Sequence, residues 1–190
     1  MTSHIVFEQH HCACYGTLLD IAMWARAREQ DENDLPVLIF EMDTGRQIDI
    51  DTRGTETEIQ TRFALPDTEE NSPQQPGKGK RGRPKLGVVG REVTLLPRHW
   101  EWLDRQRGGA SGTIRRLVDE ARKQSAHSDG IRMAQDRTNR FISAIAGDLP
   151  GFEEATRALY SGNEAAFVEH VNFWPKDVRT YTLKFSDGAF

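Results

Sequence analysis

The sequence predicts an α+β protein with four parts: a small N-terminal α+β unit, a flexible basic linker, a strand-helix-helix unit and an all-helical C-terminal tail. Short strand-like runs occur in the first 51 residues and again at 93–96, whereas helical spacing of apolar residues dominates after residue 97. Between 66 and 87, proline, glycine and polar residues replace apolar ones, which predicts a linker that is disordered in isolation. The resulting boundaries are 1–65, 66–90, 91–126 and 127–190.

The N-terminal part is expected to combine four strands with two helices. Apolar residues at helical spacing predict a helix over 17–29. Thr55 followed by Glu58 forms a capping box for a short helix over 56–64. Continuous or alternating apolar runs predict strands at 5–7, 11–15, 36–40 and 47–51.

The third part has the order strand, proline, helix, glycine turn, capped helix. The strand lies at 93–96, and Pro97 suits the first turn of a helix. The glycine pair at 108–109 breaks that helix, and Ser111 is the expected N-cap of the next one. Trp100 and Trp102 cannot share one face of the first helix. Trp100 is expected to be a core residue, and Trp102 to pack on the tail, line a dimer interface or stack on a nucleotide. The apolar positions of the second helix follow the i, i+3, i+4, i+7 pattern at Ile114, Leu117, Val118 and Ala121.

The tail is expected to be all helical. Its predicted helices run over about 129–146, from Pro150 to Gly162, from a cap at Asn163 to the residue before Pro175, and from near Asp177.

Charge divides the chain more sharply than its overall net charge of −4 indicates. Residues 1–76 carry 5 Lys+Arg and 15 Asp+Glu, residues 77–126 carry 13 and 5, and residues 127–190 carry 7 and 9. A basic middle between acidic flanks favours a polyanionic partner. It also permits self-association, with the acidic head of one copy on the basic middle of another.

The segment 77–85 places five positive charges and no negative charge in nine residues. Within it, Arg81-Gly82-Arg83-Pro84 resembles the AT-hook, which lies in the minor groove of A·T-rich DNA. A glycine lets the backbone approach the groove closely, and flanking arginines suit its concentrated negative potential. The residues expected to contact nucleic acid here are Lys78, Lys80, Arg81, Gly82, Arg83, Pro84 and Lys85.

The third part resembles a ribbon-helix-helix module, in which two chains pair their strands and the second helices clamp phosphates. Leu96-Pro97 followed by Trp100 fits the start of the first helix, and Ser111 with the following amides fits the phosphate clamp. The resemblance implies a homodimer. It also implies nucleic-acid contacts by Arg91, Arg98, Ser111, Gly112, Thr113 and Arg115.

The strand departs from this pattern. Counting back from Leu96, the groove-facing positions would be Leu95, Val93 and Arg91, although groove-reading residues are normally polar. Either the strand is shifted by one residue, which exchanges its two faces, or it does not read bases.

A longer resemblance runs through most of the chain. The block from Gly82 to Val89, the block from Arg91 to Trp100, and Ala146-Gly147-Asp148-Leu149-Pro150-Gly151-Phe152-Glu153 resemble the bacterial family called domain of unknown function 2239. The family brings no assigned activity.

Metal and catalytic chemistry receive little support. His10, Cys12 and Cys14 would share one face of a strand and could begin a zinc site. A fourth ligand is missing, the spacing is not that of a zinc finger, and free cysteines are common core residues. We expect no metal and no cofactor.

No nucleophile elbow, phosphate-binding loop or catalytic triad is present in the sequence, so we do not expect an enzyme.

The sequence therefore predicts a nucleic-acid-binding protein, DNA favoured over RNA, that acts as a homodimeric regulator. Two cysteines and the lack of a signal peptide fit the cytoplasm, and no apolar run is long enough for a membrane span. The alternatives are an adaptor whose basic segment binds an acidic protein, or an RNA- or ribosome-binding protein.

Overall fold

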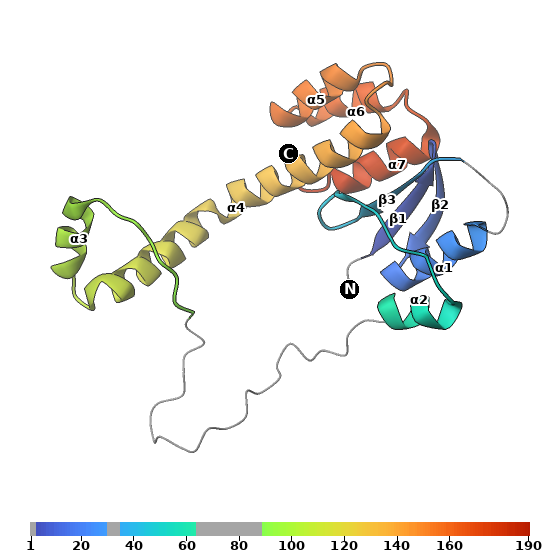
Figure 1. Cartoon of the computed structure of the whole chain (residues 1–190). Helices are drawn as coiled ribbons and strands as arrows, with labels where there is room; N and C mark the ends of the chain where they lie inside the picture. The colour runs from blue at the N-terminus through green and yellow to red at the C-terminus, as the bar shows by residue number, and fades with distance from the viewer. Residues whose placement is uncertain (1–2, 30–34, 64–88) are drawn as a thin grey trace. The chain divides into compact units, whose positions relative to one another are not determined.

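A computed structural model describes residues 3–29, 35–63 and 89–190 of the chain (Figure 1). It has two compact units. The core unit joins Met1–Ala64 with His127–Phe190, and the basic unit is Leu65–Ala126. The sequence predicts the N-terminal part and the C-terminal tail as separate parts, whereas the structure joins these two segments in one unit.

The α+β class is confirmed, with one antiparallel sheet in the core unit. The sheet has the order β2-β1-β3-β4. Central strand β1 places His4 opposite both Gly16 of β2 and Glu41 of β3. The last strand is shorter than the sequence predicts, because only two residues pair. The strands are β1 (His4–Glu8), β2 (His11–Gly16), β3 (Val37–Glu41) and β4 (Gln47–Ile48).

Helices α1 (Leu18–Glu29) and α2 (Glu56–Phe63) follow the predicted positions. The capping box is confirmed, since the Thr55 amide donates to the Glu58 carboxylate at 2.7 Å and the Glu58 amide donates to the Thr55 hydroxyl at 3.3 Å. The N-terminal end of α2 thereby satisfies two amides that a helix start otherwise leaves free.

The C-terminal helices are α4 (Gly109–Ile145), α5 (Phe152–Tyr160), α6 (Glu164–Val171) and α7 (Lys176–Phe185). The expectation of separate helices before and after about residue 127 is wrong, because α4 is continuous over 37 residues. No proline interrupts it, and a single glycine such as Gly130 costs a helix only about 1 kcal/mol. The predicted cap of α6 is confirmed, with the Asn163 side chain accepting from the Ala166 amide at 3.1 Å.

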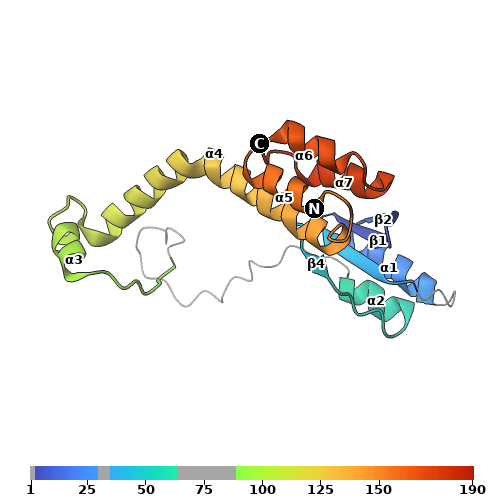
Figure 2. The same cartoon turned by 90° about the horizontal axis from the view of Figure 1, so that it is seen from above.

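Helices cover both faces of the sheet (Figures 1 and 2). One face, with Ile5, Phe7 and Phe40, packs into the larger core cluster formed with α4 to α7. The other face, with Val6 and Ile39, packs against α1. Alternation of side chains along each strand produces this three-layer arrangement.

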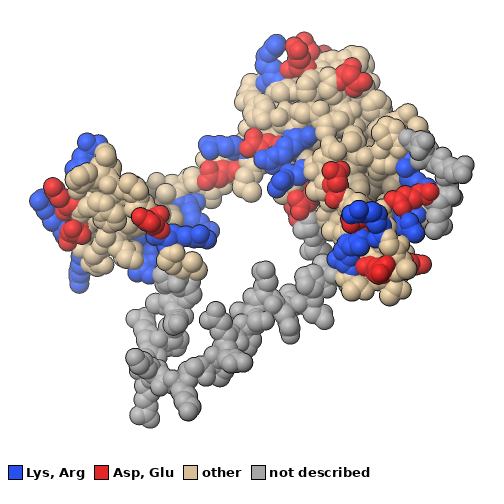
Figure 3. Space-filling model, in the orientation of Figure 1, with Lys and Arg blue, Asp and Glu red and all other residues tan. Residues whose placement is uncertain are grey.

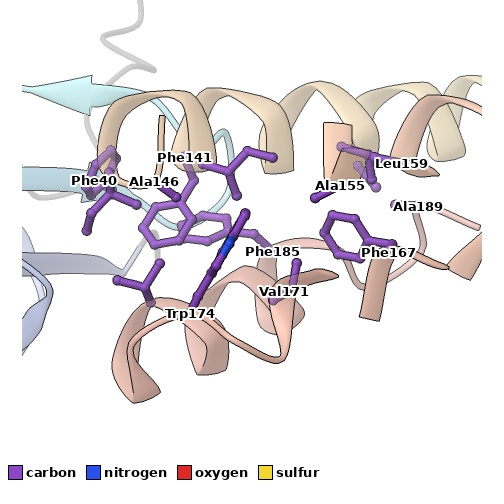
Figure 4. Close-up of a cluster of buried hydrophobic side chains, with 14 of the residues drawn as sticks. Phe40, Phe141, Ala146, Ala155, Leu159, Phe167, Val171, Trp174, Phe185 and Ala189 are labelled. Atoms are coloured by element: carbon purple, nitrogen blue, oxygen red, sulfur yellow. The ribbon is translucent and has the colours of Figure 1, made fainter. Parts of the chain in front are cut away.

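Aromatic rings fill the centre of the larger core cluster (Figure 4). Phe141 of α4 stacks on Phe185 of α7 with ring centroids 4.5 Å apart, and it meets Phe40 edge-on at 4.9 Å. The Trp174 indole donates to the Pro150 carbonyl at 2.9 Å, which satisfies the one polar atom of a buried indole. The first and last thirds of the chain therefore share one core.

The basic unit contains helix α3 (Pro97–Asp104) and the first half of α4. Residues 89–96 are in no strand, so the strand expected at 93–96 is not formed within the chain. A ribbon strand needs a partner strand for its hydrogen bonds, and nothing in the described part of this unit provides one. Trp100 is 37% exposed and Leu103 only 4%, so the expected core position of Trp100 is wrong and Leu103 occupies it.

Candidate nucleic-acid interface

Helix α3, a glycine turn and the start of α4 follow one another in the basic unit and are together called the hairpin. Pro97 starts α3 as expected, with extended Leu96 accepting from the His99 amide at 2.8 Å. The chain turns at Gly108 and Gly109, whose φ angles of +96° and +68° suit residues without a side chain. The turn therefore fixes how the exposed side chains of α3 lie with respect to the first turns of α4.

The start of α4 differs from the predicted phosphate clamp. The helix begins at Gly109, so Ser111 lies inside its first turn and is not the N-cap. In an α-helix each amide donates to the carbonyl four residues earlier, so the Thr113 amide donates to the Gly109 carbonyl. The amides that have no such carbonyl at the start of α4 include those of Ala110 and Ser111. Thr113 is 1% exposed, and its hydroxyl has no hydrogen-bond partner. Thr113 is thus a packing residue.

The remaining predicted contacts of this unit are accessible. Arg91, Arg98, Ser111 and Arg115 are exposed, and Gly112 is half-buried. The Arg115 side chain donates to the Ser111 carbonyl at 3.2 Å, which holds it over the first turn of α4. The seven arm residues from Lys78 to Lys85 lie outside the described residues.

The basic side chains at 89–126, the described part of this unit, have no acidic partners. Every ion pair between described residues lies in the core unit, and none involves a lysine or arginine of 89–126. Lys and Arg stand out around α3 and the start of α4 in the space-filling view (Figure 3). All eight of these side chains are exposed: Arg91, Arg98, Arg105, Arg107, Arg115, Arg116, Arg122 and Lys123.

Arginines of the core unit are used differently. Arg28 pairs with Glu8, and Arg53 pairs with Asp51 at 2.8 Å. The hydrogen bonds from Arg53 hold the pKa of the Asp51 carboxyl well below its ordinary range. Arg137 donates to the carbonyls of Phe185 and Asp187 at 2.9 and 2.7 Å. Arg28 and Arg137 thus join segments that are distant in the sequence, whereas the pair of Arg53 and Asp51 is local.

Apolar side chains are also exposed on the hairpin. Leu103 is the only apolar residue of 89–126 that is fully buried. The predicted stripe on α4 is present, but it faces outward in the single chain, with Leu117 and Val118 40% and 50% exposed. On the other segments of the hairpin, the exposed large apolar side chains are Val89, Val93, Leu96, Trp100 and Trp102.

The possible zinc ligands at the start of β2 are separated by a β-bulge. The pairing shifts between Val6, which faces Cys14, and Phe7, which faces Cys12. Cys12 therefore packs with the larger core cluster, and Cys14 packs with the cluster on the opposite face. The expectation that His10, Cys12 and Cys14 share a face is wrong, because one extra residue changes the alternation of the strand. Among the described residues, no three metal-capable side chains gather.

Cys12 has a structural environment instead. Its thiol donates to the Tyr181 hydroxyl at 3.6 Å, and its amide donates to the Asp177 carboxylate at 3.0 Å. Burial raises the pKa of Tyr181 to about 12, and the contact with Cys12 acts in the same direction. These bonds attach α7 to strand β2, which lies at the edge of the sheet.

A cleft of about 480 Å³ opens in the core unit beside α4. Its two arginines are already engaged, since Arg140 donates to the Thr44 carbonyl at 2.9 Å and Arg137 binds the C-terminal carbonyls. Asp43, Asp136 and Asp187 also line it. Because its arginines already bond to backbone carbonyls and aspartates lie beside them, this cleft does not suit a polyanion. The hairpin is therefore the better candidate for a nucleic-acid interface.

The fold and the hairpin define a two-unit α+β protein with an acidic, well-packed unit and a basic, largely exposed one. The chain belongs to domain of unknown function 2239, a family of uncharacterised proteins conserved in bacteria, which it matches over residues 3–186. Neither the curated proteins nor the solved structures contain a match to the chain. None of the helices in the described ranges is both long and apolar enough for a membrane span.

Proposed function

We propose that this protein binds nucleic acid, with DNA favoured over RNA, through the basic unit. The observation that carries the proposal is the set of eight exposed basic side chains at 89–126 without an acidic partner. Five acidic residues occur in the same stretch of sequence, so carboxylates are available nearby and are not used. Unpaired guanidinium groups keep their full capacity to bind phosphates.

The segment from Lys78 to Lys85 extends this surface in sequence. Together, residues 77–126 carry 13 Lys+Arg and 5 Asp+Glu. Each phosphate neutralised by such a side chain releases counterions, so affinity falls with salt by a logarithmic slope of about 0.9 per contact on duplex DNA. The arm residues Arg81 and Arg83 would track the minor groove, while Arg91, Arg98 and Arg115 would contact the backbone of the duplex.

We further propose that the protein acts as a homodimer. The apolar stripe at Ile114, Leu117, Val118 and Ala121 runs along one face of α4 and is exposed except at the half-buried Ile114, whereas a helix normally buries such a face. A second copy supplies an identical stripe, and a two-fold axis pairs the two stripes without a further partner. Dimerisation doubles the number of phosphate contacts. A role as a regulator rests on analogy with ribbon-helix-helix proteins.

The arm is tested with Arg81→Ala/Arg83→Ala in the full chain. Affinity for an A·T-rich duplex should fall, and the slope of log affinity against log salt should flatten by about 2, because two phosphate contacts are lost. Arg46→Ala/Arg157→Ala is the matched control, since both side chains are exposed and neither has an ion pair within the described residues. Undiminished binding by the arm variant, or an equal loss in the control, would overturn the arm mechanism.

An adaptor function is the second candidate, and opposite charges on the two units favour it. The core unit carries 12 Lys+Arg and 21 Asp+Glu, and the basic unit carries 13 and 8. A basic surface of this kind also attracts an acidic protein. A pulldown after nuclease treatment that recovers one acidic partner, together with no binding to any nucleic acid, would favour the adaptor.

A further inference from the structure

One face of α3 joins an exposed tryptophan to two arginines. Arg98, Trp102 and Arg105 follow the spacing i, i+4, i+7, which places them on the same side of a helix. Leu96, Trp100 and Leu103 follow the same spacing on another side, where Leu103 is buried. Helix geometry turns Trp102 about 100° away from Leu103. Trp102 thus lies outside the apolar face of α3.

Nothing in the described part of the chain accounts for the exposure of Trp102. Its side chain is 49% exposed, and none of the ring or cation–π contacts among described residues involves it. Of the other tryptophans, Trp174 is buried and Trp24 packs under Arg28 at 5.9 Å, whereas Trp100 is 37% exposed on the side of α3 that carries buried Leu103. A large apolar ring left in water, beside two arginines that have no acidic partner, is typical of a surface that binds a flat anionic ligand.

We propose that Trp102 is a stacking site for an unpaired base, with Arg98 and Arg105 holding the phosphates on either side. This inference rests on the proposed nucleic-acid function and specifies the ligand as DNA or RNA with unpaired nucleotides. A base inside a duplex has both faces covered by its neighbours, so an indole on a helix surface can stack only on a base that is free. Stacking is tolerant of sequence, because every base has an aromatic face.

A stacking site at Trp102 is compatible with a second copy packed on the apolar stripe of α4. The apolar stripe at Leu117 and Val118 lies on α4, whereas Trp102 of α3 lies among charged neighbours at Arg98, Glu101 and Arg105. Interface cores lose charged residues, so a face with three charges around its tryptophan suits a nucleotide better than a protein core.

The test compares Trp102→Ala and Trp102→Phe with wild type in the full chain. The probes are a labelled single strand of about 15 thymidines and a duplex of equal length, at one fixed salt concentration. Trp102→Ala should weaken single-strand binding about 5- to 150-fold, which corresponds to the loss of one stacked base. Trp102→Phe should recover most of this loss, and duplex affinity should change less than about 3-fold, because the phosphate contacts remain.

The control variant is Phe173→Ala, which removes another exposed aromatic ring from the core unit and should leave both affinities unchanged. Single-strand binding by Trp102→Ala at wild-type strength, from protein with an unchanged circular dichroism spectrum, would overturn the stacking site while the nucleic-acid function stands. An equal loss on duplex and single strand would also overturn it, since phosphate contacts alone would then explain the effect. Wild type that binds neither probe would overturn both proposals.

Discussion

The two units of this protein use the same residue types for opposite purposes. In the core unit, most arginines are paired with carboxylates or carbonyls and aromatic rings are packed together, as in Arg28 with Glu8 and Phe141 with Phe185. In the described part of the basic unit, residues 89–126, arginines have no acidic partners and large apolar side chains remain exposed. The core unit is therefore stabilised by its own contacts, and the exposed surface of the basic unit is where we propose that partners bind.

The largest expected effect breaks the core unit. Phe141→Ala removes a fully buried ring that contacts Phe7, Phe40 and Phe185. The free energy of unfolding should fall by about 3–5 kcal/mol, measured by urea denaturation. Trp100→Ala in the basic unit is the comparison, since its side chain is 37% exposed and its loss should cost the isolated chain far less. Equal losses in the two variants would contradict the contrast between the units.

The next effect concerns assembly. Leu117→Glu places a charge in the exposed apolar stripe of α4, where a second copy is expected to pack. Sedimentation should show a dimer for wild type and a monomer for the variant. Because Leu117 lies outside the core unit, the urea transition of that unit should be unchanged. A wild-type monomer at high micromolar concentration would exclude the dimer.

The smallest effect is a dependence of stability on pH. Burial lowers the pKa of His4 below its ordinary value of 6.5, against smaller opposing effects of Glu41 and Asp43, and its Nδ1 atom has no hydrogen-bond partner. The unfolded state then binds a proton more readily than the folded state. Stability is therefore full above about pH 6.5 and is lost as the pH falls toward the lowered pKa of the folded state.

His4→Leu should remove this part of the pH dependence. The measurement is urea denaturation of both proteins at about pH 7.5 and about pH 5.5. Wild type should lose more unfolding free energy than the variant between these values. A wild type whose stability rises on acidification relative to the variant would show that His4 gains an acidic partner in the folded state, opposite to its buried position on β1.

Local sequence patterns were sufficient for most elements of the core unit. The capping box of Thr55 and Glu58 and the cap at Asn163 are short-range features, and both are present. The continuous α4 was not predicted, because polar residues around 127–130 resemble a helix end while the cost of continuing through Gly130 is small. The joining of the first and last thirds of the chain depends on long-range packing, which periodicity does not encode.

The candidate interface could be predicted only in part. Charge identified the basic unit, and the exposed arginines agree with that. The predicted N-cap of α4 at Ser111 was three residues off, because the helix starts at Gly109, which places the N-cap at Gly108, and the positive φ of these two glycines was not foreseen. Stacking on a nucleotide was one of three roles left open for Trp102, whereas Arg105 was missed, although its spacing from Arg98 is visible in the sequence. What the sequence could not show is that both tryptophans of α3 would be exposed.

The most direct test of the account is a binding titration of the purified, nuclease-treated chain. The ligands are an A·T-rich duplex, a G·C-rich duplex and a structured RNA, each at about 50 mM and about 200 mM salt. We expect tight binding that weakens steeply with salt and prefers the A·T-rich duplex, because the arginines of the basic unit and its arm would neutralise phosphates. Absence of binding to all three ligands at the lower salt would contradict the central claim and favour an acidic protein partner.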